Sequence, residues 1–119
     1  MQTKYKASKV VVDDHKFDSK LEANIYKRIK ELGLVVELQP LYLLQDKFKF
    51  GKKTIRAITY TADFKLNING VDYILDAKGL ETQVFKIKHK LFLKTYNQDI
   101  VIVKSVKGFN EWYEKVKKA

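Results

Sequence analysis

Two aspartates and one lysine near the middle of the chain, Asp63, Asp76 and Lys78, are side chains that can bind a cation and assist a hydrolytic reaction. Between the two aspartates lies Asn69-Gly70, the strongest two-residue signal for a β-hairpin turn. If this pair forms the loop, the aspartates face each other across antiparallel strands, with Cβ atoms about 4.5–5.5 Å apart. Lys78 then lies two residues further along, on the same face as Asp76. The pattern predicts two acids and a base converging on one side of a hairpin.

Two carboxylates held this close repel each other unless a cation lies between them or solvent screens them. The chain has no cysteine and only two histidines, His15 and His89, so a zinc site is not expected. Carboxylate oxygens favour hard cations such as Mg²⁺ or Mn²⁺. Such an ion can polarise a phosphodiester and lower the pKa of a bound water, while a lysine stabilises developing charge. The pattern therefore indicates either a metal site that cleaves phosphodiesters or an exposed face on which like charges cost little.

A third acid, Glu22, lies at the edge of the apolar stripe of an expected helix and could point towards the sheet. A second interpretation competes with this one. Ser19-Lys20-Leu21-Glu22 matches a capping box, in which the glutamate side chain bonds back to the amide of Ser19. One side chain can serve only one of these roles at a time, and the residues alone leave both open.

The charge balance favours a polyanionic partner. The chain carries 24 Lys and Arg against 14 Asp and Glu, for a net charge of +10. Three stretches, 1–12, 47–62 and 82–98, hold basic residues and no acid. Basic stretches around a small group of acids, here Asp63, Asp72 and Asp76, are typical of nucleic-acid binding. A lysine-rich surface can also serve solubility alone. The sequence shows no apolar run of about 18 residues and no signal-peptide-like segment, so we expect neither a membrane span nor export, and we expect a cytoplasmic protein.

Hydrophobic periodicity and turn residues give the elements that would position these side chains. Apolar residues at helical spacing, ended by Gly33, predict the first helix, and strict alternation predicts the strand that carries Asp63. The expected elements are a short strand at 9–12, a turn at 13–14, a helix at 19–32, a β-prone stretch at 35–45 with Pro40 at an edge or bulge, a turn region at 48–51, strands at 58–68 and 71–78, a helix at 82–96, a strand at 100–103 and a closing helix at 109–118.

This order, αβββαβα, predicts a single α/β domain over residues 1–119, with a mixed β-sheet flanked by helices. The first three main strands form an antiparallel meander. The strand at 71–78, the helix at 82–96 and the strand at 100–103 form a right-handed crossover, which makes the two strands parallel.

Three segments resemble the motifs of the PD-(D/E)XK nuclease superfamily. They are Phe17-Asp18-Ser19-Lys20-Leu21-Glu22-Ala23, Tyr60-Thr61-Ala62-Asp63-Phe64 and Asp76-Ala77-Lys78-Gly79. More narrowly, they resemble a group of small phage proteins classed as a domain of unknown function, which is related in pattern to phage and archaeal Holliday-junction resolvases. The resemblance covers nearly the whole chain and implies a restriction-endonuclease-like fold. It has two departures, both common variations: Ala62 stands where the superfamily has proline, and Asp76 is shorter than glutamate.

The resemblance implies a Mg²⁺- or Mn²⁺-dependent endodeoxyribonuclease. The positions of its catalytic residues are occupied by Glu22, Asp63, Asp76 and Lys78, and those of its metal ligands by Glu22, Asp63, Asp76 and the carbonyl of Ala77. It thereby favours the ligand role of Glu22 over the cap. It further implies duplex or branched DNA as substrate, and phage recombination or replication in the host cytoplasm as the setting. A homodimer is implied because one site per small chain cuts only one strand.

Two further groups are candidate DNA contacts. Lys86 and Lys90 lie four residues apart on one face of the second long helix, and Gln83 lies in its first turn. Lys52 and Lys53 lie in the acid-free basic stretch in the middle of the chain. A solvated lysine face on an amphipathic core helix explains the first group equally well. The alternative function is a non-catalytic nucleic-acid-binding module with the same fold, although repelling carboxylates beside phosphate do not suit such a module.

Overall fold

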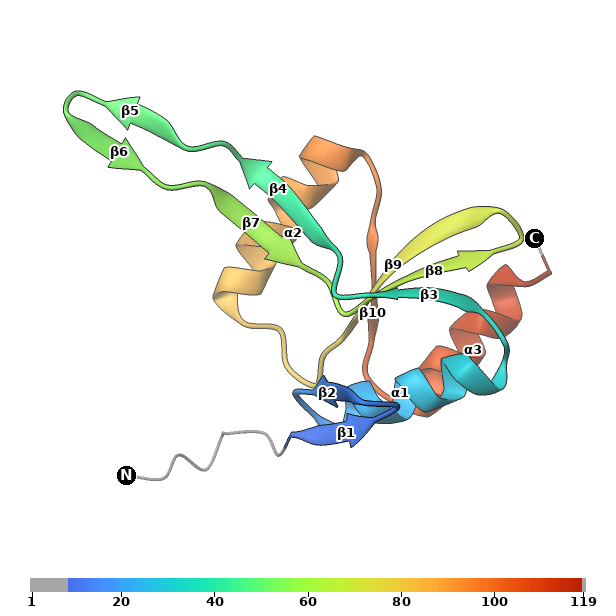
Figure 1. Cartoon of the computed structure of the whole chain (residues 1–119). Helices are drawn as coiled ribbons and strands as arrows, with labels where there is room; N and C mark the ends of the chain where they lie inside the picture. Colours follow the sequence, from blue (N-terminus) through green and yellow to red (C-terminus); the bar gives the residue numbers. More distant parts are fainter. Residues whose placement is uncertain (1–8, 119) are drawn as a thin grey trace.

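Three helices and ten short strands make up residues 9–118, the part of the chain that the computed structural model describes. Figure 1 shows helices around a sheet, from which one strand pair projects. This is the mixed α/β fold that the sequence predicts. The elements are β1 (Val10–Val12), β2 (His15–Phe17), α1 (Lys20–Glu31), β3 (Val35–Leu38), β4 (Leu41–Gln45), β5 (Phe48–Phe50), β6 (Lys53–Ile55), β7 (Ile58–Thr61), β8 (Phe64–Ile68), β9 (Val71–Ala77), α2 (Gln83–Tyr96), β10 (Ile100–Val103) and α3 (Val106–Val116).

Four strands form the central sheet, in the order β10-β9-β8-β3. β3, β8 and β9 run antiparallel, and β10 joins β9 in parallel after the α2 crossover, as predicted. Ile68 pairs with Val71 and Phe64 with Leu75, the register that a two-residue Asn69-Gly70 loop imposes. Both loop residues have positive φ, 53° and 83°, which a type I′ turn requires. The predicted hairpin is therefore confirmed, with its register from Ile68–Val71 to Phe64–Leu75, whereas the expected pair of Asp63 and Asp76 is not part of the ladder because β8 begins at Phe64.

Neither of the two long β-runs expected at 35–45 and 58–68 is a single strand. The first breaks at Gln39-Pro40 and the second at Ala62-Asp63, so that β3 and β8 stay in the sheet while β4 and β7 leave it. Gln39 adopts a left-handed φ of 50° and the proline after it has no N–H to donate, which ends β3. The alternation of apolar residues continues through the second break, and for this reason periodicity does not reveal it.

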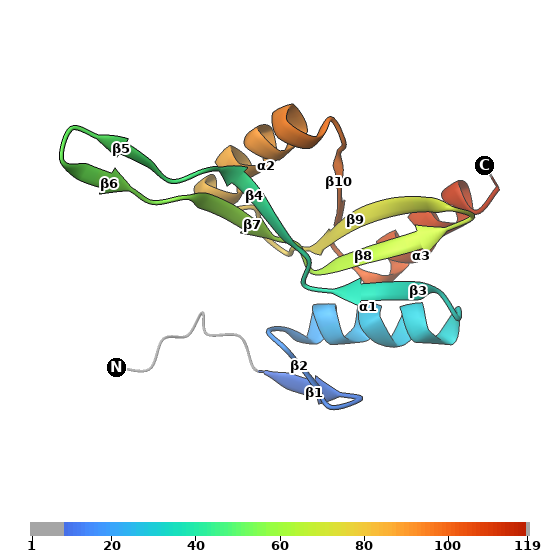
Figure 2. The ribbon, with the colours of Figure 1, turned by 45° about the horizontal axis from the view of Figure 1, so that its top comes forward.

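The two breaks lie side by side and together form a bend. Beyond this bend the same two segments continue as a projecting arm, made of β4 with β7 and of β5 with β6 (Figures 1 and 2). At its base, the N–H of Gln39 donates to the carbonyl of Asp63 at 3.0 Å. The turn region expected at 48–51 is wrong in its first three residues, which form β5. The turn of the arm begins at Gly51, whose φ of 62° suits glycine.

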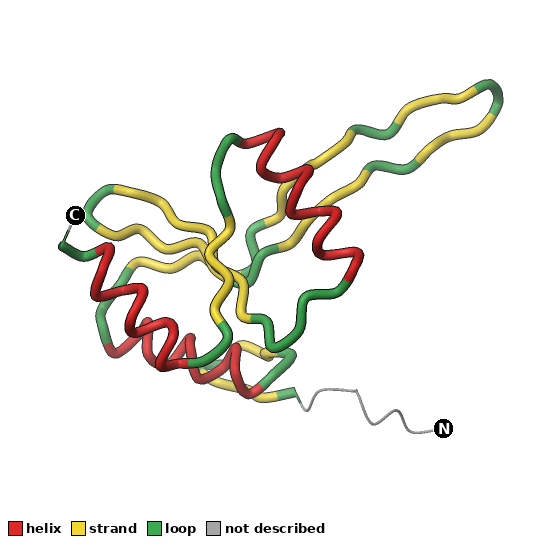
Figure 3. Tube along the Cα trace, turned by 180° about the vertical axis from the view of Figure 1, so that it is seen from behind, coloured by secondary structure: helices red, strands yellow, loops and turns green. Residues whose placement is uncertain are grey.

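Helices cover the two faces of the sheet in different ways. α1 and α3 pack on one face, around a core that includes Ile25 and Phe109. α2 packs on the other side together with β4 and β7, around Tyr60 and Phe92. Figure 2 shows α1 and α2 on opposite sides of the sheet, and Figure 3, from behind, shows α2 beside the base of the arm. The bend thus lies where two separate packing layers meet.

Hydroxyl side chains cap all three helices. Ser19, Thr82 and Ser105 each accept a hydrogen bond from the backbone N–H three residues further on. α1 and α2 therefore begin close to where the sequence predicts, whereas α3 begins three residues before its expected start at 109, because Ser105 caps it. None of the helices in the described part of the chain is long and apolar enough to cross a membrane.

Candidate active site

The two predicted aspartates meet where the arm leaves the sheet. Asp63 lies in the bend between β7 and β8, and Asp76 is the second-last residue of β9. The backbone N–H of Asp63 donates at 3.2 Å to the carbonyl of Leu75, which is already the strand partner of Phe64, so the regular ladder ends at Phe64 and Asp63 lies in the bend. Its side chain then extends the contact, because Oδ2 accepts the N–H of Ala77 at 2.7 Å. The bend therefore aims this carboxylate at the end of β9.

Asp76 is almost completely buried, with 2% of its surface exposed. The phenol of Tyr60, on β7, donates to Asp76 Oδ2, and Lys78 Nζ lies 3.5 Å from Oδ1. Burial and the nearby Asp76 raise the pKa of the Tyr60 phenol, which keeps it a donor. The ring of Phe85, on α2, has its centroid 4.5 Å from the same ammonium. Each oxygen of Asp76 thus has a partner, and the lysine is held between a carboxylate and an aromatic face.

Glu22 reaches the same place from α1. Its backbone N–H donates to Ser19 Oγ at 3.1 Å, so one half of the capping box forms. Its side chain is 5% exposed and shares a hydrogen bond with the side chain of Asp63. The amide of Glu22 therefore serves the cap while its carboxylate faces the aspartates. The two interpretations that the sequence left open do not exclude each other.

Burial and mutual repulsion dominate the electrostatics of these three residues, which we call the acid cluster (Glu22, Asp63 and Asp76). Burial, followed by the hydrogen bond and the charge of Asp76, raises the pKa of Asp63 from 3.8 to about 9, against the lowering effect of the Ala77 amide. Burial also raises the pKa of Glu22, and the charge of Asp18 adds to that rise. Two acids that share a hydrogen bond need a proton between them, and the raised pKa assigns it to Asp63 at neutral pH.

The donors of the acid cluster are all oxygen atoms. Buried carboxylates that repel each other suit a hard divalent cation, which takes carboxylate and carbonyl oxygens. Within residues 9–118, no three or more His, Cys, Asp or Glu side chains form a group that could hold a metal ion as they stand. The charge of Asp76 raises the pKa values of both Glu22 and Asp63, so the three acids lie close together. The cluster therefore fits such a cation in the chemistry of its donors, and its side chains would have to rearrange to bind one.

The predicted DNA contacts lie on two other parts of the molecule. Lys52 lies in the turn at the tip of the arm and Lys53 begins β6 beside it, and both are exposed. Gln83, Lys86 and Lys90 are exposed on α2. The structure brings neither group into the acid cluster, whereas it brings all four predicted catalytic residues to one place.

Tyr60 is the site residue that sequence reasoning missed. Its alternation with Ala62 and Phe64 marks it as a core residue, and it is buried. Its ring centroid lies 6.4 Å from that of Tyr42 and 5.8 Å from that of Phe92. A buried tyrosine needs a hydrogen-bond partner for its O–H. A tyrosine at a predicted core position therefore implies an acceptor nearby, and this is the one feature of the sequence that indicates the contact.

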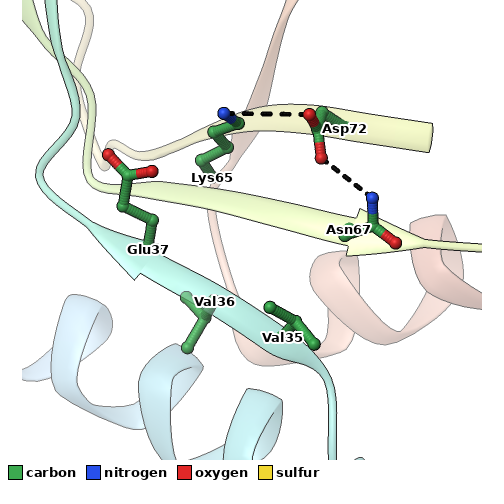
Figure 4. A pocket seen from close by; sticks show the side chains of 6 residues that line it. All are labelled: Val35, Val36, Glu37, Lys65, Asn67 and Asp72. Atoms are coloured by element: carbon green, nitrogen blue, oxygen red, sulfur yellow. Dashed lines mark hydrogen bonds and ion pairs between the residues drawn. The ribbon is translucent and has the colours of Figure 1, made fainter. Parts of the chain in front are cut away.

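A second group of charged residues lies along the same hairpin, beside a hollow of about 290 Å³ on the sheet (Figure 4). There Lys65 Nζ lies 3.7 Å from Asp72 Oδ2, and Asn67 Nδ2 donates to Asp72 Oδ1 at 3.0 Å. Val35 and Val36 of β3 line the same hollow. Glu37, which also lines the hollow, is exposed, and the Lys65 and Asp72 side chains are 36% and 50% exposed, so these charges form a solvated surface group.

A comparison with protein families matches residues 2–111 to a family described as "Protein of unknown function (DUF1064)". No curated protein matches the chain. The family match covers most of the chain, including the whole acid cluster and Lys78, and its description assigns no activity. The geometry of the acid cluster is therefore the main evidence for a function.

Proposed function

We propose that this chain, which belongs to the DUF1064 family, is a metal-dependent endodeoxyribonuclease that hydrolyses phosphodiester bonds. One observation carries the proposal: carboxylates from α1, the bend and β9 converge on one point with a single lysine beside them. Burying like charges together costs free energy, so this crowding does not serve stability. It is typical of a site at which strongly shifted acids perform a function.

Mg²⁺ or Mn²⁺ is the proposed cofactor, and the residues that would hold it are Glu22, Asp63, Asp76 and the carbonyl of Ala77. When bound, the ion supplies polarisation of the scissile phosphate and lowers the pKa of an attacking water. Asp63 has to lose its proton before it can act as a ligand, so cation binding and proton release are linked at this site. Tyr60 keeps Asp76 in one orientation through its hydrogen bond.

Lys78 has the role of a fixed positive charge beside the reacting phosphate. Its ammonium is held between Asp76 Oδ1 and the ring of Phe85, at 3.5 and 4.5 Å. A charge that is already in place needs no reorganisation when negative charge develops on the phosphate oxygens. The lysine can equally orient the attacking water by a hydrogen bond.

The proposed substrate is DNA, and the arm supplies a large part of the surface for it. Residues 47–62, which run over the tip of the arm, hold five basic residues and no acid. Lys52 and Lys53 lie at the tip, and the side chains of Phe48 and Phe50 are 46% and 73% exposed beside them. Aromatic rings among lysines suit bases that are not fully stacked in a duplex. These features favour branched DNA, such as a Holliday junction, over continuous duplex.

Membership of the PD-(D/E)XK nuclease superfamily, with a restriction-endonuclease-like fold, is part of the proposal. It is supported by the arrangement of Glu22 on a helix, Asp63 before one strand and Asp76-x-Lys78 at the end of the next around one point. A homodimer is proposed because one acid cluster per chain cuts one strand, and resolving a junction requires two cuts. The proposed setting is recombination or replication of phage DNA in the host cytoplasm.

Parallel cleavage assays on a four-way junction, a duplex, a flap and a single strand test this proposal. We expect cleavage with Mg²⁺, greatest on the junction, and none with EDTA. Lys78→Ala should lose most of the activity, and Lys65→Ala, a β8 lysine paired with Asp72, should keep it. If the wild type binds these DNAs and cuts none of them with Mg²⁺ or Mn²⁺, the proposal fails in favour of a non-catalytic DNA-binding module.

A further inference from the structure

A groove of about 330 Å³ lies beside the acid cluster, between β7 and the first turns of α2. Thr59 and Thr61 line it from β7, and Thr82 and Lys88 line it from the α2 side. Lys78 lines it as well. Because Lys78 is also the cation beside Asp76, the groove and the acid cluster share this residue.

The lining of the groove is cationic and rich in hydroxyl groups. Two lysines and three threonines line it, and no carboxylate does so within the described part of the chain. Thr82, the N-cap of α2, belongs to it, so the positive end of the helix dipole lies at its edge. Ammonium groups and hydroxyl donors in a lining that holds no carboxylate complement a phosphodiester backbone, whose phosphates are charged and accept hydrogen bonds.

Lys88 is the α2 lysine on the groove side of the helix. Positions two residues apart lie about 160° from each other around an α-helix, so Lys86 and Lys90 lie nearly opposite Lys88. Lys88 is partly buried, whereas Lys86 and Lys90 are exposed. The two lysines that the sequence suggested as DNA contacts therefore face away from the groove and from the acid cluster.

We infer that the groove holds a backbone phosphate of the DNA strand being cut, next to the scissile one, and that Lys88 is its main contact on α2. The inference rests on the proposed nuclease function and assigns the phosphate contact on this helix to Lys88 in place of Lys86 and Lys90. The hydroxyls of Thr59 and Thr61 are further donors to the same strand. Lys78 lies between this phosphate and the acid cluster, which places the next phosphate at the reacting centre.

A comparison of Lys88→Gln with Lys86→Gln tests the inference, because both remove one positive charge from α2 on opposite sides of the helix. Binding of a labelled four-way junction is measured by fluorescence anisotropy in EDTA, which prevents cleavage, at several salt concentrations. We expect Lys88→Gln to weaken binding roughly five- to tenfold near 0.1 M salt and to make the slope of log affinity against log salt shallower by about 0.9. Lys86→Gln should behave as the wild type.

A second variant keeps the inference testable if Lys88→Gln is poorly folded. The double variant Thr59→Val, Thr61→Val removes two hydroxyls and no charge, so it should weaken binding without changing the salt slope. Circular dichroism checks the fold of each protein. Wild-type affinity in Lys88→Gln, or an equal loss in Lys86→Gln, would overturn the groove assignment and leave the nuclease proposal standing. Failure of the wild type itself to bind any DNA would overturn the proposed function.

Discussion

The two ends of the β8–β9 hairpin carry aspartates in opposite circumstances. At the turn end, the Asp72 side chain is 50% exposed, lies 3.7 Å from Lys65 Nζ and accepts a hydrogen bond from Asn67 (Figure 4). At the bend end, Asp76 is 2% exposed and shares a hydrogen bond with Asp63. At the turn end, the charge of Asp72 is balanced by Lys65 and by solvent. At the bend end, three acids, buried or half-buried, face one lysine.

The difference shows which carboxylates are placed for something other than stability. An exposed ion pair such as Lys65 with Asp72 contributes about 0–1 kcal/mol and needs no further explanation. A buried group of acids costs free energy through desolvation and repulsion. Asp63, Asp72 and Asp76 lie within 14 residues of each other, and only their surroundings in the fold separate a solvated aspartate from a candidate ligand.

Substituting one aspartate at each end of the hairpin should give the largest difference in activity between the two ends. Asp76→Asn should reduce cleavage of a four-way junction by roughly 10²–10³-fold or more, because it removes a charge that holds the cation and the reacting groups in place. Asp72→Asn should cut at the wild-type rate. Initial rates on gels at saturating Mg²⁺ measure both. Equal rates in the two variants would mean that the site has been assigned to the wrong end.

Removing the hydroxyl of Tyr60 gives a smaller effect at the bend end. Tyr60→Phe keeps the ring in the aromatic core and frees Asp76 to turn, so we expect the affinity for Mn²⁺ and the cleavage rate to fall about 10–100-fold. Tyr42→Phe, in the same aromatic cluster, is the matched control and should change neither. If both variants bind Mn²⁺ as the wild type does, the hydrogen bond has no positioning role.

The raised pKa of Asp63 predicts how stability depends on pH in EDTA. Between pH 3.8 and about 9, the folded chain holds a proton on Asp63 that the unfolded chain has released. The folded state then binds more protons, so the free energy of unfolding falls as pH rises through this range. Asp63→Asn should flatten the fall, and Asp72→Asn should leave it unchanged. Thermal melting over the same pH range measures this, and an identical slope in wild type and Asp63→Asn would contradict it.

The smallest expected effect is on stability at the turn end. Asp72→Asn breaks an exposed pair, so the free energy of unfolding should change by less than about 1 kcal/mol at neutral pH. Urea denaturation measures the difference. A loss of several kcal/mol would show that Asp72 is part of the structural core, and the contrast between the two ends would then disappear.

Local chemistry made part of this structure predictable. Asn69-Gly70 fixed the hairpin register because few residues tolerate positive φ at both turn positions, and this register brings the chain just before β8 beside the end of β9, where Asp63 and Asp76 lie. Helical spacing and the hydroxyl caps placed α1 and α2. The Asp-x-Lys pattern at the end of β9 then gave Lys78 its place beside Asp76.

The features that depend on long-range packing could not be predicted from the sequence. Tyr60, Ala62 and Phe64 stay buried on both sides of the bend, although β7 packs against α2 and β8 belongs to the central sheet. A period of two residues records burial and does not record which layer covers the strand. The contact of Tyr60 with Asp76 and the groove position of Lys88 both follow from that change of layer, so neither could be found in the sequence.

Titration calorimetry of Mn²⁺ binding, without DNA and in two buffers of different ionisation enthalpy, shows whether the acid cluster is a divalent-cation site balanced by a proton on Asp63. We predict saturable binding that releases close to one proton per chain near neutral pH, and loss of binding in Asp76→Asn but not in Asp72→Asn. Absence of saturable binding to the wild type, or undiminished binding to Asp76→Asn, would contradict the account.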